Sequence, residues 1–210
     1  MPEPVDVIMA IHHAFRKDME SIDAAAFDLA KGKKDPNATI ERFRFFNEIL
    51  VWHAKGEEAG VFPALEKVAP LVAEAYVTDH HGLDMAFEEL KDAYSTGDTI
   101  RTARATAAFR FHLRMHLAKE DAHLYRIFRE RVPLTDQWET ISVLTGMIPK
   151  DRFPELVGWW FPLVGQNDRE NIIRIWQMRM PAPAFANVKE LIKTSIGGDW
   201  AELARRIPGL

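Results

Sequence analysis

The feature that most constrains the fold is an internal repeat, because a shift of 63 residues superposes two segments with the same helical pattern. Eight positions keep their chemical type: Phe46, Leu50, His53, Glu57, Glu58, Val61, Phe62 and Leu65 match Phe109, Leu113, His116, Glu120, Asp121, Leu124, Tyr125 and Phe128. A histidine and a glutamate four residues apart lie one turn apart on the same helix face. Since apolar residues share that face, each segment predicts an amphipathic helix that turns an imidazole and a carboxylate into the core.

A looser repeat, at a shift of 68 residues, relates two further helical segments. Its matching positions are Ile8, His12, Phe15, Met19 and Ile22 against Tyr76, His80, Leu83, Phe87 and Leu90. Each segment contains a His-His pair, and the helical phase separates the two histidines of each pair. His12 and His80 share their faces with apolar residues, whereas His13 and His81 share theirs with charged residues. We therefore expect His12 and His80 to point inward, and His13 and His81 to be mostly solvated.

The chain predicts an all-α fold, because no stretch alternates with the two-residue period of a strand. Four long helices are expected at about 4–31, 37–68, 70–95 and 98–130, and their short connections favour an antiparallel up-down four-helix bundle. Shorter helices are expected further along, at about 135–148, 152–164, 168–179, 182–196 and 198–206. This pattern divides the chain into a bundle domain, residues 1–131, and a C-terminal helical extension, residues 132–210.

Composition excludes several classes of protein. The 210 residues contain no cysteine, so disulfide scaffolds, cysteine-ligated zinc, iron–sulfur clusters and thiol catalysis are ruled out. The formal net charge of −4, without a basic stripe, argues against nucleic acid as a partner. The N-terminus lacks the pattern of a secretory signal, and the longest apolar stretch is too short to span a membrane. We expect a cytoplasmic protein that does not act at a membrane.

Six inward polar groups require compensation: a histidine on each of four helices and a glutamate on each of two. Each of them alone would more often be a hydrogen-bonded core residue, but all six occupy core faces of a two-fold repeat. Burying two carboxylates without compensation would cost several kcal/mol each, so bound metal is the simplest explanation. Nitrogen and oxygen donors without sulfur suit iron, manganese or zinc. The predicted ligands are His12, His53, Glu57, His80, His116 and Glu120.

These residues resemble the haemerythrin-like family, also called the HHE cation-binding domain. WHAKGEEAGVFPAL and MHLAKEDAHLYRIF resemble its two signature segments, and the resemblance covers about residues 5 to 130. It implies a four-helix bundle with a non-haem di-iron centre, in which two iron ions are bridged by the two glutamates and an oxo or hydroxo group. Ferritin-like carboxylate proteins are a weaker alternative, because they need two Glu-x-x-His motifs and this chain has one, from Glu120 to His123.

Departures from the family pattern bear on function. Oxygen-carrying haemerythrins have a second histidine one turn after the third-helix ligand and an aspartate five residues after the last histidine. This chain has Asp84 at the first position and a shorter spacing, from His116 to Glu120, at the second. It therefore resembles bacterial and sensory members more than a dedicated oxygen carrier. Those members imply reactions with O2, peroxide or nitric oxide, or iron-dependent regulation.

Further residues are candidates for a role around the metal. His112, one turn before His116, is expected to be either a fifth nitrogen ligand or a donor behind a ligand, with a core histidine as the equal alternative. Tyr76, one turn before His80, is a candidate for hydrogen bonding a bound oxygen species, although such a tyrosine is more often simply packed. Arg16 and Asp84 suggest a salt bridge beneath the site or exposure at the rim of the bundle.

The extension is rich in aromatic residues, with five of the six tryptophans between Trp138 and Trp200. Its apolar surface predicts packing on the bundle or a homo-oligomer interface. Similar extensions follow the bundle in some haemerythrin-like proteins, including plant iron-sensing ubiquitin ligases. Three functions remain open at this point. They are a di-iron protein that binds or consumes O2, peroxide or nitric oxide, an iron or oxygen sensor or iron store without turnover, and a metal-free helical interaction protein.

Overall fold

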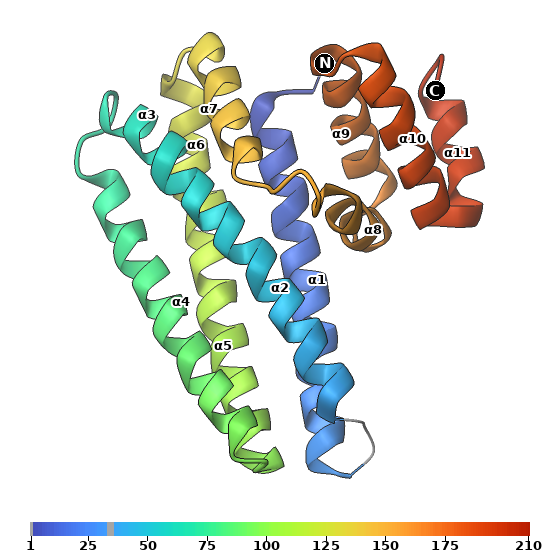
Figure 1. The fold of residues 1–210 in the computed structure, drawn as a ribbon. Coiled ribbons are helices and arrows are strands. Elements are labelled where there is room, and N and C mark those ends of the chain that lie inside the picture. The colour runs from blue at the N-terminus through green and yellow to red at the C-terminus, as the bar shows by residue number, and fades with distance from the viewer. Residues whose placement is uncertain (1, 33–35) are drawn as a thin grey trace. The chain divides into compact units, whose positions relative to one another are not determined.

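The computed structural model describes residues 2–32 and 36–210, and every regular element in these ranges is a helix. Figure 1 shows the four long helices of the expected bundle. The first and third bundle helices are α1 (Pro4–Ala30) and α4 (Val72–Ser95). The second and fourth start as α2 (Pro36–Gly56) and α5 (Thr99–Lys119) and continue through further elements. The prediction of an all-α haemerythrin-like bundle is confirmed.

The second and fourth bundle helices each contain a π-helical turn that the sequence pattern did not predict. Helix α2 continues through the π turn η1 (Glu57–Val61) into α3 (Phe62–Glu66). Helix α5 continues in the same way through η2 (Glu120–Leu124) into α6 (Tyr125–Arg131). A π turn widens the helix by one residue and is frequent at functional sites. Both turns begin at a predicted glutamate ligand.

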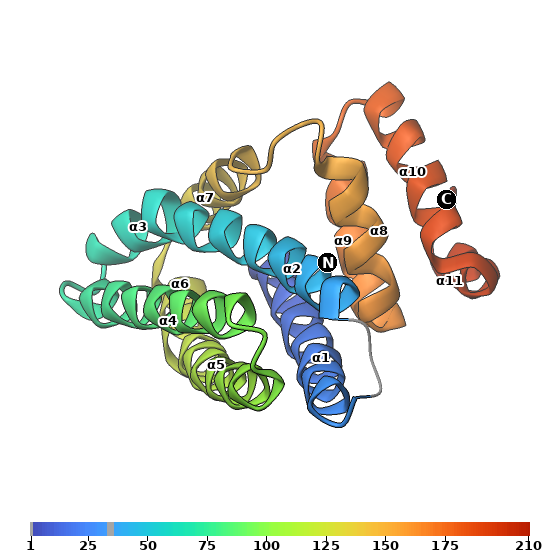
Figure 2. The ribbon, with the colours of Figure 1, turned by 60° about the horizontal axis from the view of Figure 1, so that its bottom comes forward.

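Local capping fixes the two ends of α4 and the start of α5. Leu71 precedes α4 in the left-handed region, with φ of 69°, and its backbone N–H donates to the carboxylate of Glu66 at 3.0 Å. After α4, Gly97 supplies a second positive φ, of 70°. Asp98 then accepts hydrogen bonds from the backbone N–H groups of Ile100 and Arg101, as a helix N-cap does. The chain therefore reverses sharply, and α4 and α5 lie side by side in Figures 1 and 2.

Aromatic rings fill the end of the bundle core away from the two π turns. Phe43 packs edge-on against Phe109 with ring centroids 5.3 Å apart, and Phe15 packs against Phe46 at 5.5 Å. All four rings are buried. Asp18 is also buried in this region, and its carboxylate accepts hydrogen bonds from Arg42. This packing holds α1, α2 and α5 together beneath the polar part of the core.

Helix α7 (Leu134–Gly146) packs on the bundle, although the predicted bundle boundary falls at residue 131. Residues Phe15–Met147, which include α7, form one compact unit. Two glycines explain the close approach. A Cβ atom at Gly56 would lie 2.7 Å from Leu144 Cγ, and one at Gly60 would lie 3.3 Å from Val143 Cβ. Both glycines border Glu57, so α7 supports the π turn that carries this glutamate.

The other compact unit contains residues up to Ala14 and Ile148–Leu210. Its helices are α8 (Phe153–Leu163), α9 (Gln166–Arg179), α10 (Ala182–Ile196), the 3-10 turn η3 (Gly197–Asp199) and α11 (Trp200–Arg206). The Trp176 ring lies 5.5 Å from Phe161 and 6.1 Å from Trp160, and all three side chains are buried. These aromatics therefore form a core of their own. Within the described ranges, no helix combines the length and the apolarity needed to cross a membrane.

Candidate metal centre

The six predicted ligands are all buried. Glu57 and Glu120 have no exposed surface, and the four histidines are at most 4% exposed. The two glutamates are the first residues of η1 and η2, so the repeat in the sequence reappears as a repeat of π turns. A buried carboxylate without compensation is costly, and two of them in one core need opposite charge close by.

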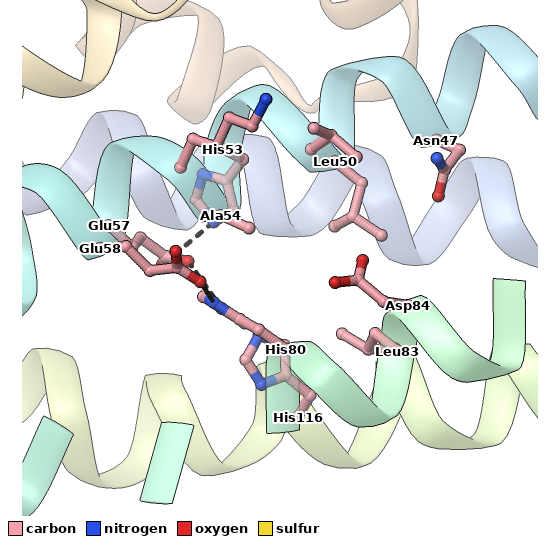
Figure 3. A pocket seen from close by; sticks show the side chains of 12 residues that line it. Asn47, Leu50, His53, Ala54, Glu57, Glu58, His80, Leu83, Asp84 and His116 are labelled. Atoms are coloured by element: carbon pink, nitrogen blue, oxygen red, sulfur yellow. Dashed lines mark hydrogen bonds and ion pairs between the residues drawn. The ribbon is translucent and has the colours of Figure 1, made fainter. Parts of the chain in front are cut away.

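Imidazole and carboxylate groups converge within the bundle. His53 Nε2 lies 3.2 Å from Glu57 Oε1, and His116 Nε2 lies 3.2 Å from Glu120 Oε1. His80 Nε2 approaches the other oxygen of Glu57, Oε2, at 3.3 Å. Glu57, His80, His116 and Glu120 each offer a ligand atom within 4.8 Å of the others, and so do His53, Glu57 and Glu120. The two sets share both glutamates, and Figure 3 shows His53 and His80 on opposite sides of Glu57.

His12 lies on α1 and has no exposed surface. It stands one turn before Phe15, so the two side chains share the inner side of the helix. The Phe15 ring is 5.5 Å from the ring of His53, which places that side of α1 next to the imidazole of α2. The neighbouring His13 is exposed, and its Nδ1 lies 2.9 Å from Asp168, as expected for the solvated member of the pair.

Carboxylates lie behind two of the histidines. Glu58 Oε1 is 2.7 Å from His80 Nδ1, and Asp79 Oδ2 is 3.6 Å from His116 Nδ1. Asp79 is itself paired with Lys119. The hydrogen bond to Glu58 fixes the tautomer and the ring orientation of His80, which leaves its Nε2 directed at the cluster, whereas Asp79 lies beyond hydrogen-bond distance of His116. Sequence reasoning paired Glu58 with Asp121 in the repeat and did not assign either Glu58 or Asp79 to the site.

Tyr125 is a functional candidate that sequence reasoning missed. It is 1% exposed, and its hydroxyl donates a hydrogen bond to Glu57 Oε1. The matching residue in the repeat, Phe62, has no hydroxyl and instead stacks on His80 with ring centroids 5.4 Å apart. The exchange of phenylalanine for tyrosine at this pair is the one signal in the sequence that could have identified the donor.

The two glutamates differ in their electrostatic surroundings. Burial alone would raise the pKa of Glu57, but His53 and His80 hold it well below its usual range. Burial and the charge of Glu57 raise the pKa of Glu120 well above its usual range. Burial also opposes protonation of His80, yet Glu57 and Glu58 raise its pKa. In the metal-free protein the pair therefore favours ionisation at Glu57 and protonation at Glu120, because two adjacent buried carboxylates resist ionising together.

The donor set fits bound cations. Glu57 Oε2 and His80 Nε2 are buried and lie 3.3 Å apart, but among the described residues neither atom makes a hydrogen bond of good geometry. Buried polar atoms are normally satisfied, and an exception calls for a missing partner such as an ion. Imidazole nitrogens with carboxylate oxygens suit iron, manganese or zinc, and a carboxylate shared by two donor sets can bridge two ions.

A cavity of about 130 Å³ adjoins the cluster between α2 and α4. Leu50 and Leu83 form apolar walls, Asn47 and Asp84 lie along it, and the imidazole of His80 borders it (Figure 3). This volume suits a molecule of a few atoms rather than an extended organic substrate. The cavity therefore offers a small ligand a path to the histidines and to Glu57.

Two predicted positions differ from their expected surroundings. His112 is exposed and is not among the clustered ligand atoms. Its repeat counterpart Ile49 is buried, so the two halves of the repeat differ at this position. Tyr76 is buried, with its hydroxyl 3.1 Å from His123 Nδ1 and 3.2 Å from the carbonyl oxygen of Lys119, so it hydrogen bonds protein groups beside the cluster.

The remaining candidate residues lie at the edge of the site. Arg16 forms an ion pair with Asp121, whereas Asp84 is exposed along the cavity. The suggested pairing of Arg16 with Asp84 is therefore replaced by a link between α1 and η2. His123, expected to be peripheral, is exposed and reaches the site only through Tyr76.

The fold and the site define a class of protein, a four-helix bundle with a buried cluster of histidine and glutamate side chains that suits cations. Residues 3–128 match the hemerythrin HHE cation binding domain, and the chain belongs to this family. The resemblance inferred from the six-residue pattern is thereby confirmed.

Comparison with known proteins also finds plant relatives. Zinc finger protein BRUTUS of Arabidopsis thaliana is 24% identical over 202 residues, which cover 93% of this chain and 16% of that protein. A BRUTUS-like zinc finger protein of the same plant is 20% identical over 194 residues, covering 83% of this chain and 16% of the relative. The matched region thus spans less than a fifth of each relative and includes the C-terminal helices. No solved structure matches the chain.

Proposed function

We propose that this chain holds a pair of iron ions and reacts with O2, peroxide or nitric oxide. The observation that carries the proposal is the pair of overlapping donor sets that share Glu57 and Glu120. His53, with His12 from α1, would serve one ion, and His80 with His116 would serve the other. Manganese and zinc accept the same donors and are the alternatives for the metal.

The chain's own residues prepare the site for this chemistry. When bound, the iron pair would supply electrons and an open coordination position for a small oxidant. Glu58 orients the ring of His80, and Asp79 places a negative charge near His116, while Tyr125 holds one oxygen of Glu57. Glu120 would lose its proton when the cations bind, because their charge replaces that proton. The apolar walls of the cavity keep bulk water away from the reacting molecule.

The test is the metal content of each chain, measured together with the visible spectrum before and after peroxide is added. We expect two irons per chain and absorption bands of an oxo-bridged pair. His53→Ala and His116→Ala should each lower the metal content, because each removes a buried nitrogen donor. His112→Ala is the matched control, since His112 is exposed one turn before His116. Full metal content in both ligand variants would contradict the assignment.

A regulatory function without turnover is a second candidate, favoured by the same buried carboxylates. Their repulsion is relieved when cations bind, so metal occupancy would change the stability of the bundle strongly. A sensor predicts a large fall in melting temperature on chelation and no catalytic consumption of peroxide. Rapid peroxide turnover by the iron-loaded protein would instead favour the enzyme. An unchanged melting temperature after complete chelation would contradict the sensor.

A further inference from the structure

The outer face of the α4 and α5 hairpin exposes large apolar side chains. Met85 on α4 is 70% exposed, and Phe111 and Met115 on α5 are 62% and 49% exposed. Single exposed apolar residues are common on protein surfaces, but a contiguous group of this kind marks a site of contact with another molecule. Whether the three side chains form one patch depends on the register of the two helices.

The antiparallel register places them together. The Tyr76 hydroxyl meets the carbonyl oxygen of Lys119 at 3.2 Å, and Gly82 and Met115 line one surface hollow. Met85 follows Gly82 by one turn, and Phe111 precedes Met115 by one turn, so these two residues are level on neighbouring helices. We call the surface formed by Gly82, Met85, Phe111 and Met115 the α4–α5 face. Both ribbon views show the two helices side by side along their length (Figures 1 and 2).

The two helices of this surface carry opposite net charges. Helix α4 contains six acidic residues and one lysine, a net charge of −5 with histidine neutral. Helix α5 contains four arginines, one lysine and no acidic residue, a net charge of +5. Asp84 and Glu88 flank the apolar residues on α4, and Arg104 and Arg114 flank them on α5, all four exposed. A surface with an acidic half, a basic half and an apolar seam is complementary to itself.

We propose that the α4–α5 face binds a second copy of this chain. Most homo-oligomers use a two-fold axis, which brings the same patch of both subunits together. An axis parallel to the helices places the acidic α4 of each subunit on the basic α5 of its partner. It also brings Met85 of one subunit level with Phe111 of the partner subunit. An axis across the helices would oppose like charges, and complementary potential therefore selects the first arrangement.

This pairing has a consequence for the metal centre. Thr78, Gly82, His112 and Met115 line a hollow of about 230 Å³ that reaches His116. A second copy on the α4–α5 face covers this hollow and shields the outer side of His116 from water. The cavity between α2 and α4, which adjoins His53 and His80, is a separate approach to the cluster. The dimer therefore leaves this cavity open to a small ligand.

The first test measures molar mass by light scattering and sedimentation over a dilution series. The wild-type chain should dimerise reversibly, and Phe111→Asp should weaken the dimer at least about 100-fold, as loss of a central apolar contact does. Phe27→Asp on α1 is the matched control, because Phe27 is 58% exposed outside the face, and it should leave dimerisation unchanged. Equal melting temperatures would show that both variants fold. A monomer at every wild-type concentration, or a dimer unaffected by Phe111→Asp, overturns the proposal.

The second test reverses charge on one helix at a time. Arg104→Glu with Arg114→Glu makes the residues that flank the apolar side chains acidic on both helices, and Asp84→Lys with Glu88→Lys makes them basic on both helices. Each variant alone should be monomeric, because like charges then face each other at these flanking positions across the two-fold axis. An equimolar mixture should form a heterodimer, since the acidic flanking residues of one variant then face the basic flanking residues of the other. A mixture that stays monomeric, or variants that dimerise alone, would show that this arrangement is wrong.

Discussion

Replacing Gly56 by alanine tests the packing that supports the metal centre. In an unhindered helix interior the change stabilises a protein by about 0.5–1 kcal/mol, because alanine loses less conformational entropy than glycine. Here the new Cβ would lie 2.7 Å from Leu144 Cγ and 2.9 Å from Leu144 Cα. The side chain of Leu144 can rotate, but its Cα can move only with α7. Overpacking of this kind costs about 1–3 kcal/mol, so we expect a net destabilisation of about 1–2 kcal/mol.

The matched control is Gly82→Ala, because a Cβ at Gly82, inside α4, meets no atom within 4 Å. Urea unfolding of the metal-free protein, at a concentration where it is monomeric, should show destabilisation for Gly56→Ala and slight stabilisation for Gly82→Ala. Gly56→Ala should also weaken metal uptake, because the backbone that must move to make room for the new Cβ lies one residue before Glu57. Equal stabilisation by both substitutions would refute the argument that α7 packs on this turn through Gly56.

Three further predictions concern the titratable core. Tyr125→Phe should lower the free energy of unfolding by about 1.5–3 kcal/mol, the value of a hydrogen bond to an ionised carboxylate, in denaturant titrations. Burial raises the pKa of Tyr76 and of Tyr94 to about 12 and that of Tyr125 well above its usual value. The folded protein should therefore show little tyrosinate absorption at pH 10, where a free tyrosine is about half ionised. The raised pKa values of the tyrosines contribute to the free energy of unfolding. This contribution is complete below about pH 10 and is lost as the pH rises towards about 12, which unfolding measured against pH would detect. Glu57→Gln should lower the free energy of unfolding of the metal-free protein by about 3–5 kcal/mol, because it removes the anion of a buried ion pair. Glu120→Gln should lower it by less than about 1 kcal/mol, because it replaces one neutral group by another. Both glutamine variants should lose bound metal, and equal stabilities would contradict the assignment of the proton to Glu120.

The helical period of the sequence was sufficient to place the ligand-bearing side chains in the core. Burial repeats every 3.6 residues along a helix, so the apolar neighbours of His53 and Glu57 determine which way both groups point. The same argument separated His80 from His81, one buried and the other exposed. It depended on nothing beyond each helix, which is why it succeeded before the packing of the helices was known.

Features that depend on neighbouring elements escaped the sequence pattern. A π turn adds one residue to a helical turn without altering which residues are apolar, so neither η1 nor η2 could be read from the period. His112 was expected at the metal or in the core because it lies one turn before His116, but its side chain is exposed on α5. The hydroxyl of Tyr125 was indistinguishable from an ordinary core aromatic until Glu57 was found within its reach.

The two halves of the cluster share a repeat but not the same surroundings. Glu58 hydrogen bonds His80, whereas its counterpart Asp121 pairs with Arg16, and Asp79 lies 3.6 Å from His116 Nδ1. Tyr125 donates to Glu57, and the Phe62 that replaces it in the other half cannot donate to Glu120. Two cations held here would therefore have the same donor atoms but different charge and hydrogen bonding around them. A small molecule entering between α2 and α4 would meet His53, His80 and His116 together with the carboxylate of Glu57, whereas Glu120 does not line this cavity.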